Sequence, residues 1–286
     1  MNLLYGLIYL LLAPIVGGII IGLDRKVTAR MQGRVGPPIR QPFYDVLKLF
    51  EKEKLAVAPS QNVFVLGYIL FMAFAGALFF SGGDFLLVIF ALTLSHIFLV
   101  LAAYSASSAY GFIGAERELI QLMAFEPMIL LVASGMYLAT RSFYVSDIVG
   151  TAKPLILLLP GLFLGLLFVL TLKMRKSPFD LSTSHHGHQE IVKGITTEFT
   201  GSTLGRVEIA HWYETVLIMG FVYLFFGFSM PLALAAVALT YFLEILVDNT
   251  YPRFKWHLAL KSAWLAALIF GMANLTVLWY FVRGGP

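Results

Sequence analysis

Long apolar stretches recur along this chain and are incompatible with a soluble fold. A bilayer core of about 30 Å is crossed by roughly 20 mostly apolar residues in an α-helix. The composition agrees, because 59% of the 286 residues are apolar and only 13% are charged. The sequence therefore predicts an all-α integral membrane protein that forms a single membrane domain over residues 1–286. Eight transmembrane helices are expected, at residues 3–23, 63–81, 85–104, 119–140, 154–172, 211–230, 232–248 and 262–282.

Basic residues gather in the segments that follow the first, third, fifth and seventh predicted spans. Of the 20 Lys and Arg residues, only Arg141, Lys153 and Arg283 fall on the opposite side. The positive-inside rule makes the basic side cytoplasmic, so both termini should lie outside a multi-pass protein of the cell membrane. This topology accounts for the net charge of +4, and no nucleic-acid partner is expected.

The chain contains no cysteine. It therefore has no thiolates of its own with which to hold an iron–sulfur cluster. No cofactor is expected in this chain, and any redox centre that it serves should lie on a partner subunit.

Two predicted cytoplasmic loops, at about residues 24–62 and 173–210, are unusually long. Within the first, the apolar residues Phe43, Val46, Leu47 and Phe50 follow helical spacing, which predicts an amphipathic helix over residues 42–52. Such a helix serves either as an interfacial anchor or as a lid or docking surface for a soluble partner.

The second long loop is rich in histidine and carboxylate. His185, His186 and His188 precede Glu190, and these residue types are common metal ligands. Their spacing matches no zinc signature, and a solvated turn or a proton relay fits equally well. No metal ligand or catalytic residue is therefore assigned.

Glu126 is an ionisable residue placed well inside an apolar span, where such groups often belong to an ion or substrate path. The alternative is a glutamate that hydrogen-bonds the backbone at the kink of Pro127. His96 lies at a similar depth in the preceding span, so the two side chains could exchange a proton if those helices are neighbours. Two further acids, Glu116 and Glu118, lie at the entrance to the span that holds Glu126. Glu214, Glu244 and Asp248 fall in the cytoplasmic parts of the sixth and seventh predicted spans.

Several sequence blocks together resemble the NADH dehydrogenase subunit 1 family. This is the eight-helix heel subunit that joins the peripheral and membrane arms of respiratory complex I and of energy-converting membrane-bound hydrogenases. The match spans most of the chain. It is carried by Gln32, Arg34, Gly36 and Pro37, by Asp45, Lys48, Phe50, Lys52 and Glu53, by Gly114–Arg117 and Phe125–Glu126, and by Phe179–Asp180, Gln189–Glu190, Gly194 and Glu198–Gly201.

The resemblance implies a coupling role. In that family the cytoplasmic loops contact the soluble redox arm, and a chain of buried carboxylates connects it to ion-pumping, antiporter-like subunits. Glu126, Asp180, Glu190 and Glu198 match acids of the family pattern. We expect an ion path of His96, Glu116, Glu118, Glu126, Asp180, Glu190, Glu198, Glu214 and Glu244, and redox-arm docking by Arg30, Arg34, Lys48, His185, His186 and His188.

The interval Leu181–His188 departs from quinone-using members, which carry further acids there. This departure and the pair Glu126–Pro127 resemble the hydrogenase branch and its archaeal sulfur-reducing relatives, which favours a ferredoxin-driven, quinone-independent complex. Iron–sulfur clusters, and in a hydrogenase a nickel–iron centre, would lie on partner subunits.

Two other function classes fit parts of the sequence. In a stand-alone secondary transporter, Glu126 and His96 would bind a substrate or a coupling proton, although no internal repeat is evident. In an intramembrane metalloenzyme, the histidines near 185–188 would converge on a metal. The sequence leaves open whether H⁺ or Na⁺ moves and which terminal acceptor is reduced.

Overall fold

The structure, a computed structural model, describes residues 2–53, 58–176, 179, 182, 193–252 and 254–284. Within these ranges the regular elements are helical, and one isolated bridge joins Asp84 to Tyr144. The helices are α1 (Leu3–Met31), α2 (Gln41–Glu51), α3 (Pro59–Phe80), α4 (Phe85–Tyr104), α5 (Ala109–Thr140), α6 (Val145–Gly150), α7 (Leu155–Leu158), α8 (Pro160–Lys173), the 3₁₀ turn η1 (Gly194–Thr196), α9 (Gly201–Leu224), α10 (Met230–Thr250), α11 (Trp256–Ala266), the π-helical η2 (Ala267–Met272) and α12 (Ala273–Gly284).

Among the described residues, 6 helices are long and apolar enough to cross a membrane. They are α1, α3, α4, α5, α10 and the continuous helix that α11, η2 and α12 form from Trp256 onward. These helices confirm a multi-pass membrane protein. The other two predicted spans, residues 154–172 and 211–230, correspond to α7 with α8 and to α9.

Within the described chain, neither of these two predicted spans is among the helices long and apolar enough to cross a membrane, and each exception has a physical reason. The span predicted at 154–172 is broken between α7 and α8, where Pro160 takes the first position of the new helix and has no backbone N–H to donate. Helix α9 is 24 residues long but carries Arg206, Glu208 and Glu214. It contacts α1, α2, α3 and α10, so protein rather than lipid surrounds much of it.

Three helices extend furthest beyond the predicted spans. Helix α1 continues to Met31, α5 already begins at Ala109, and α9 already begins at Gly201. Hydropathy detects only the apolar part of a helix, whereas the backbone hydrogen bonds continue into polar residues. The two long predicted loops are correspondingly shorter in the structure.

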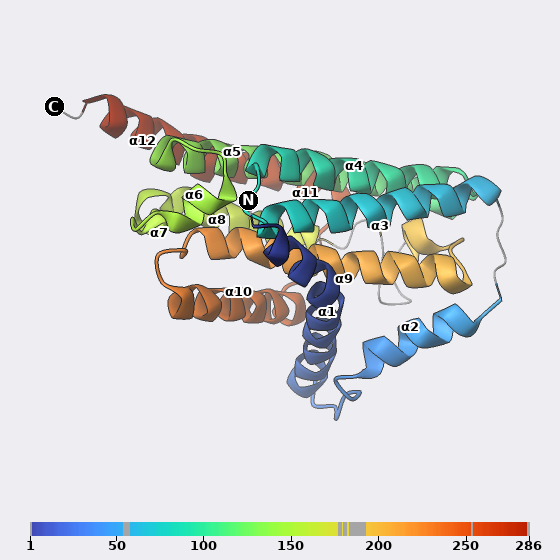
Figure 1. Cartoon of the computed structure of the whole chain (residues 1–286). Helices are drawn as coiled ribbons and strands as arrows, with labels where there is room; N and C mark the ends of the chain where they lie inside the picture. The colour runs from blue at the N-terminus through green and yellow to red at the C-terminus, as the bar shows by residue number, and fades with distance from the viewer. Residues whose placement is uncertain are drawn as a thin grey trace.

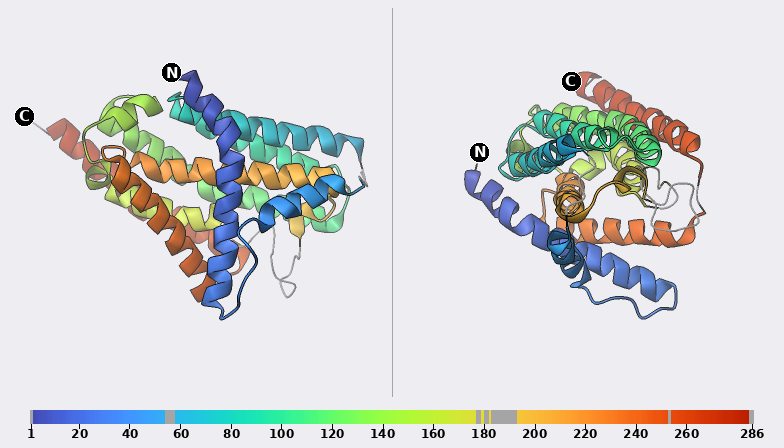
Figure 2. Two further views of the ribbon diagram at one scale, coloured as in Figure 1. Left: turned by 60° about the horizontal axis from the view of Figure 1, so that its bottom comes forward. Right: turned by 90° about the vertical axis from the view of Figure 1, so that its right-hand side faces the viewer.

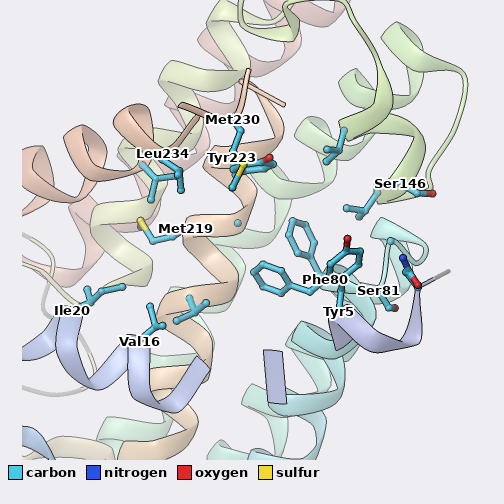
Figure 3. A pocket seen from close by; sticks show the side chains of 18 residues that line it. Tyr5, Val16, Ile20, Phe80, Ser81, Ser146, Met219, Tyr223, Met230 and Leu234 are labelled. Atoms are coloured by element: carbon cyan, nitrogen blue, oxygen red, sulfur yellow. The ribbon is translucent and has the colours of Figure 1, made fainter. Parts of the chain in front are cut away.

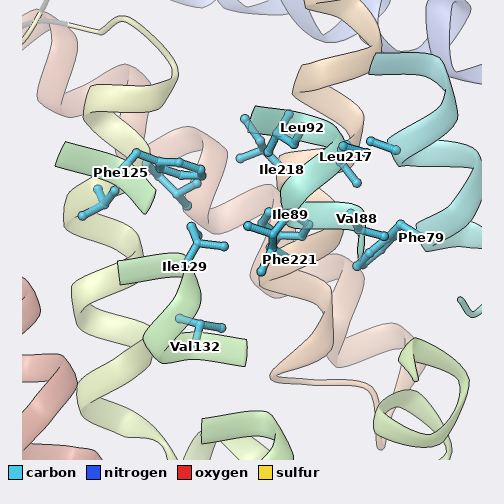
Figure 4. Packing of buried hydrophobic residues seen from close by; sticks show 14 of the residues in the cluster. Phe79, Val88, Ile89, Leu92, Phe125, Ile129, Val132, Leu217, Ile218 and Phe221 are labelled. Atoms are coloured by element: carbon cyan, nitrogen blue, oxygen red, sulfur yellow. The ribbon is translucent and has the colours of Figure 1, made fainter. Parts of the chain in front are cut away.

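Helices α3, α4, α5 and α9 form the centre of the bundle and lie along a common axis, with α4 antiparallel to the other three (Figure 1). Their apolar side chains meet in one large core (Figure 4). The rings of Phe85 and Phe221 lie 5.1 Å apart in an edge-to-face arrangement, and Phe79 lies 5.5 Å from Phe221. This core holds the helices that carry the buried charges described below.

Helix α1 crosses the bundle steeply instead of running along it (Figure 2). A Cβ atom on Gly17 would lie only 2.5 Å from the carbonyl oxygen of Trp212, so the crossing against α9 requires glycine. Nearby, the Tyr9 hydroxyl donates to the Tyr213 carbonyl at 2.9 Å, and the Tyr213 hydroxyl donates to the Leu10 carbonyl at 2.6 Å. These contacts fix the tilt of α1.

The predicted amphipathic helix is present as α2, one residue earlier than expected at each end. Its expected apolar face is divided. Val46 is buried, and the Phe43 ring lies 5.2 Å from the Trp212 ring of α9. Leu47 and Phe50 are instead 60% and 44% exposed. The helix therefore packs one apolar edge against α9 and leaves a second edge uncovered in this chain.

Candidate functional site

Five charged or ionisable side chains meet inside the bundle, although they come from four separate segments. We call this set the central cluster, and it consists of His96, Glu118, Lys173, Arg175 and Glu214. Helix α4 supplies the histidine, α5 and α9 supply the two glutamates, and the end of α8 with the turn after it supplies the two cations. Because α4 packs against α5 and α5 packs against α8, these groups converge where the helices meet.

The closest contacts join Glu214 to Lys173 and His96. Glu214 Oε1 lies 2.8 Å from Lys173 Nζ and 2.9 Å from His96 Nε2. The side chain of His96 is 0% exposed, and those of Lys173 and Glu214 are 2% exposed. Neither approach has the angles of a hydrogen bond to Oε1, so this oxygen keeps hydrogen-bonding capacity within the described part of the chain. A proton or an ordered water can be accepted there.

His96 is placed to exchange a proton at one ring nitrogen. Its Nδ1 lies 2.9 Å from the carbonyl oxygen of Leu92, which only accepts hydrogen bonds, so Nδ1 carries a hydrogen. Its Nε2 lies 2.6 Å from Lys173 Nζ and can accept from that ammonium group. When Nε2 gains a proton, Glu214 at 2.9 Å becomes its partner. The imidazole therefore has a polar contact for either protonation state of Nε2.

Glu118 and Arg175 form the other half of the central cluster. Arg175 Nη2 donates to Glu118 Oε1 at 3.0 Å, and the same oxygen lies 4.0 Å from His96 Nε2. Arg175 lies in the turn after α8, where burial lowers its pKa. The Glu118 carboxylate and the other neighbours of Arg175 together raise this pKa by more, so that the guanidinium stays charged. The second oxygen of Glu118 is buried without a hydrogen-bond partner among the described residues. Two carboxylates thus face two fixed cations, and His96 lies between them.

The segment 173–176 serves a second group of charges between α1 and α10. We call it the lateral cluster, and it consists of Asp24, Lys176, Tyr241 and Asp248. Lys176 pairs with Asp24, and its Nζ lies 3.4 Å from Asp248 Oδ2. The Tyr241 hydroxyl donates to Asp24 Oδ2 at 3.1 Å.

Arg175 has a left-handed backbone conformation, with φ at 53°. Such a conformation costs about 1–3 kcal/mol in a residue other than glycine and is common at functional sites. At this turn, Lys173 and Arg175 reach the central cluster while Lys176 reaches the lateral cluster. The strained turn therefore divides neighbouring cations between two sites.

The structure brings together three of the predicted ion-path residues, namely His96, Glu118 and Glu214. Glu126 does not pair with His96 as the depth argument had suggested. It is half-buried, and its Oε1 atom has no hydrogen-bond partner among the described residues. The reason is helix rotation, because residues at one depth can face different sides of a helix. The alternative of a backbone hydrogen bond to this oxygen is not observed in the described chain either.

The remaining predicted acids lie apart from the central cluster. Glu244 is 3% exposed and lies one turn before Asp248, and its Oε2 atom has no hydrogen-bond partner among the described residues. Glu116 is exposed on α5, and Glu198 is half-buried before α9. Asp180 and Glu190 lie outside the described residues.

The predicted docking residues Arg30, Arg34 and Lys48 are exposed around the end of α1 and along α2. Close to them, Arg25 Nη1 lies 2.7 Å from Asp45 Oδ2 and ties α2 to α1. His185, His186 and His188 lie outside the described residues, and no group of three potential metal ligands occurs among the residues that are described.

Sequence reasoning missed the cations and the lateral contacts. Lys173, Arg175 and Lys176 were assigned to a cytoplasmic loop by the positive-inside rule, and Asp24 was placed just beyond the first span. His211, the first residue of the span predicted at 211–230, is not among the predicted site residues, yet its Nδ1 lies 3.2 Å from Glu214 Oε2. A usable signal existed, because buried carboxylates require compensating cations and Lys173 directly follows the span predicted at 154–172.

Comparison with known proteins was decisive on the family. The family model described as NADH dehydrogenase matches residues 4–279. The chain belongs to this family. Hydrogenase-4 component C of Escherichia coli (strain K12), a relative, is 30% identical over 96% of this chain and 92% of its own length. NADH-ubiquinone oxidoreductase chain 1 of Cnephaeus nilssonii is 28% identical over 97% of this chain and 96% of its own length.

A solved structure extends the family likeness to the whole fold. A chain in the structure of the membrane-bound sulfane sulfur reductase, an archaeal respiratory membrane complex, superposes with a TM-score of 0.83. The two chains are 26% identical, and the match covers 95% of this chain and 98% of the other. The expected resemblance to complex I heel subunits and to their hydrogenase and sulfur-reductase relatives is therefore confirmed.

Proposed function

We propose that this chain is the membrane coupling subunit of a complex I-related respiratory complex, in which it links electron transfer in a soluble redox arm to translocation of H⁺ or Na⁺. The observation that carries the proposal is the central cluster. The cluster holds two buried carboxylates, two largely buried cations and one histidine whose Nε2 can be either protonated or unprotonated. Its total charge can therefore change by one unit. A change of one charge in a dry site is energetically large and is felt by every neighbouring group.

We propose a ferredoxin-driven complex, either a membrane-bound hydrogenase or a sulfane sulfur reductase. Support comes from the likeness to Hydrogenase-4 component C and to a chain of the sulfane sulfur reductase complex. The hydrophilic redox-arm subunits would hold the iron–sulfur clusters and, in a hydrogenase, a nickel–iron centre. Antiporter-like membrane subunits would be the ion-pumping partners.

We propose eight spans, both termini outside, and long loops facing the cytoplasm in the cell membrane, all within one membrane domain. The starts of α3, α5 and α9 and the end of α4 lie at one end of the bundle (Figure 1). Arg117 and Arg206 lie near that end, whereas Arg141 follows the far end of α5. The docking face for the redox arm would then include α2 and the exposed residues Arg30, Arg34 and Lys48.

The test uses the whole complex in sealed vesicles, with reduced ferredoxin as electron donor. Glu214→Gln should lower ion uptake about a hundredfold, the scale of losing a positioned proton-transfer group, while electron transfer continues. Asp147→Asn, at an exposed acid on α6 outside the docking face, is the matched control and should leave both rates unchanged. Unchanged ion uptake in Glu214→Gln would remove the central cluster from the path.

A second variant separates coupling from folding. Glu214→Gln alone leaves Lys173 buried without its carboxylate, so the complex could fail to assemble. The double variant Glu214→Gln/Lys173→Met restores charge balance and should recover assembly without recovering ion uptake.

The composition of the native assembly tests the class of complex. Extraction in mild detergent should yield a large assembly that contains iron. Nickel in addition would indicate a hydrogenase, and iron without nickel would indicate a sulfur- or quinone-reducing complex. A lone chain without metal would instead support the stand-alone transporter.

A further inference from the structure

A large cavity lies between α1, α9 and α10 (Figure 3). Its volume is 860 Å³, within the range of about 300–1,000 Å³ typical of small-molecule sites. One end is bounded by α6 and by the turn after α3. At this turn the backbone N–H of Asn2 donates to the Ser81 carbonyl at 2.9 Å. Beyond the other end, α1 and α10 meet again through Tyr241 and Asp24. The tilt of α1 thus creates a gap that is limited along its length.

The walls of this cavity are almost entirely apolar. Val16 and Ile20 of α1 face Met219 of α9 and Leu234 of α10 (Figure 3). The polar residues Asn2, Ser81 and Ser146 gather at the end where α3 stops and α4 is about to begin. The cavity therefore has one polar end and a long apolar body, which is the polarity of an amphiphile.

We propose that one acyl chain of a bilayer lipid occupies this cavity, with its polar headgroup at the end formed by Asn2, Ser81 and Ser146. Three of the walls belong to helices that are long and apolar enough to cross the membrane, α1, α3 and α10, so the cavity lies at hydrocarbon depth. Protein interiors do not retain voids of this size, and apolar walls give water too few partners. In a membrane, the acyl chains of the surrounding lipids are available to fill this cavity.

The dimensions favour a lipid chain over a helix of a partner subunit. A transmembrane helix is about 10 Å wide and about 30 Å long, a cylinder of roughly 2,400 Å³. The cavity, at 860 Å³, takes only part of such a cylinder. A hydrocarbon chain is narrow enough to enter between α1 and α10, where Val16 and Leu234 are 42% and 54% exposed.

The test uses the whole complex in lipid nanodiscs of phosphatidylcholine and phosphatidylglycerol, with a trace of phosphatidylglycerol that carries a photoreactive diazirine on one acyl chain. After illumination, mass spectrometry should place saturable labels on Met219, Tyr223 or Leu234, and unlabelled phosphatidylglycerol should displace them. Leu234→Trp fills the cavity and should lower this labelling about tenfold, the effect of withdrawing two buried methylenes. Leu239→Trp, at a similarly exposed position of α10 outside the cavity, should leave it unchanged.

The opposite wall provides an independent pair of variants. Val16→Trp should lower the same labelling, whereas Ile15→Trp, exposed but outside the cavity, should not. Labelling no stronger than on other lipid-facing helices, or unchanged by both filling variants, would overturn the proposal. Displacement by an isoprenoid quinone but not by phosphatidylglycerol, or protection by a neighbouring subunit, would overturn it as well. The readout requires no ion transport, so it is separate from the test of coupling.

Discussion

The central and lateral clusters both take cations from the segment 173–176. They differ in the balance of charge and in access to water. In the central cluster, two carboxylates meet two cations, and the side chains of Glu118, Glu214 and Lys173 are only 1–2% exposed. In the lateral cluster, Lys176 serves both Asp24 and Asp248, whose side chains are 14% and 26% exposed. One site is dry and neutralised, and the other is wetter and, among the described residues, places two carboxylates around Lys176.

This difference assigns different roles to the two sites. A dry, balanced site resists any change of charge, so a proton that enters it must be accompanied by a movement of neighbouring groups. A wetter site in which two carboxylates share one lysine can take up a further cation with little rearrangement. The turn at Arg175, which holds both sets of cations, is therefore the element through which a change at one cluster would reach the other.

The largest expected effect is on stability at the central cluster. Lys173→Met leaves Glu214 and His96 buried without their cation and should lower the free energy of unfolding by about 3–5 kcal/mol. Lys176→Met removes the corresponding group of the lateral cluster and should cost about 1 kcal/mol or less. Thermal melting of the purified complex, read by size-exclusion chromatography, gives both shifts. Equal shifts would show that the two clusters do not differ in the way described.

The next effect tests whether the lateral cluster depends on the tilt of α1. In Gly17→Ala, the new methyl group would meet the Trp212 carbonyl at 2.5 Å and should destabilise the α1–α9 crossing by about 1–3 kcal/mol. Hydrogen exchange should rise in α1 and around Lys176 while α4 and α5 stay protected. Gly150→Ala is the control, because nothing lies within 4 Å of its added methyl group. Loss of protection in α4 would mean that the clusters are not independent.

A smaller, pH-dependent effect comes from Arg175, whose raised pKa keeps it charged at every accessible pH. The contribution of Arg175 to stability is therefore constant between about pH 6 and 8. Arg175→His substitutes a cation whose pKa is about 6.5 when unfolded and is raised beside Glu118 when folded. The new imidazolium should stabilise the folded protein fully below about pH 6.5. This stabilisation should decline by at most about 1.4 kcal/mol per pH unit as the pH rises toward the pKa of the imidazole in the folded protein. Melting of the complex across this range provides the measurement, and a pH-independent variant would contradict the assigned pairing.

The sequence predicted the membrane-spanning architecture well because hydrocarbon imposes one simple rule, a long apolar helix. The amphipathic spacing of residues 42–52 located α2 to within one residue for the same kind of reason. The division of its apolar face was not predictable, because it depends on where Trp212 lies in space. Hydropathy likewise missed the break at Pro160 and the polar first part of α9, which begins at Gly201.

The sequence predicted several residues of the candidate site but not the residues with which they pair. His96, Glu118 and Glu214 were identified because ionisable residues in spans are conspicuous in a sequence. Their partners Lys173 and Arg175 were not, since a cation at the end of a span is equally typical of a cytoplasmic loop. Only the path of the turn after α8, with its left-handed residue Arg175, brings these cations back inside the bundle.

The smallest expected effect measures how wet the lateral cluster is. Tyr241→Phe removes the hydroxyl that donates to Asp24 at 3.1 Å and should lower stability by about 0.5–1.5 kcal/mol if nothing replaces it. Because the Asp24 side chain is 14% exposed, water can take the place of the hydroxyl, and the loss should fall at the low end of that range. Tyr251→Phe, at an exposed position beyond the end of α10, is the matched control. A double variant with Lys176→Met should be non-additive, since both partners share Asp24. A loss as large as that of Lys173→Met would instead place Asp24 in a dry site, and the lateral cluster would then be a second closed network.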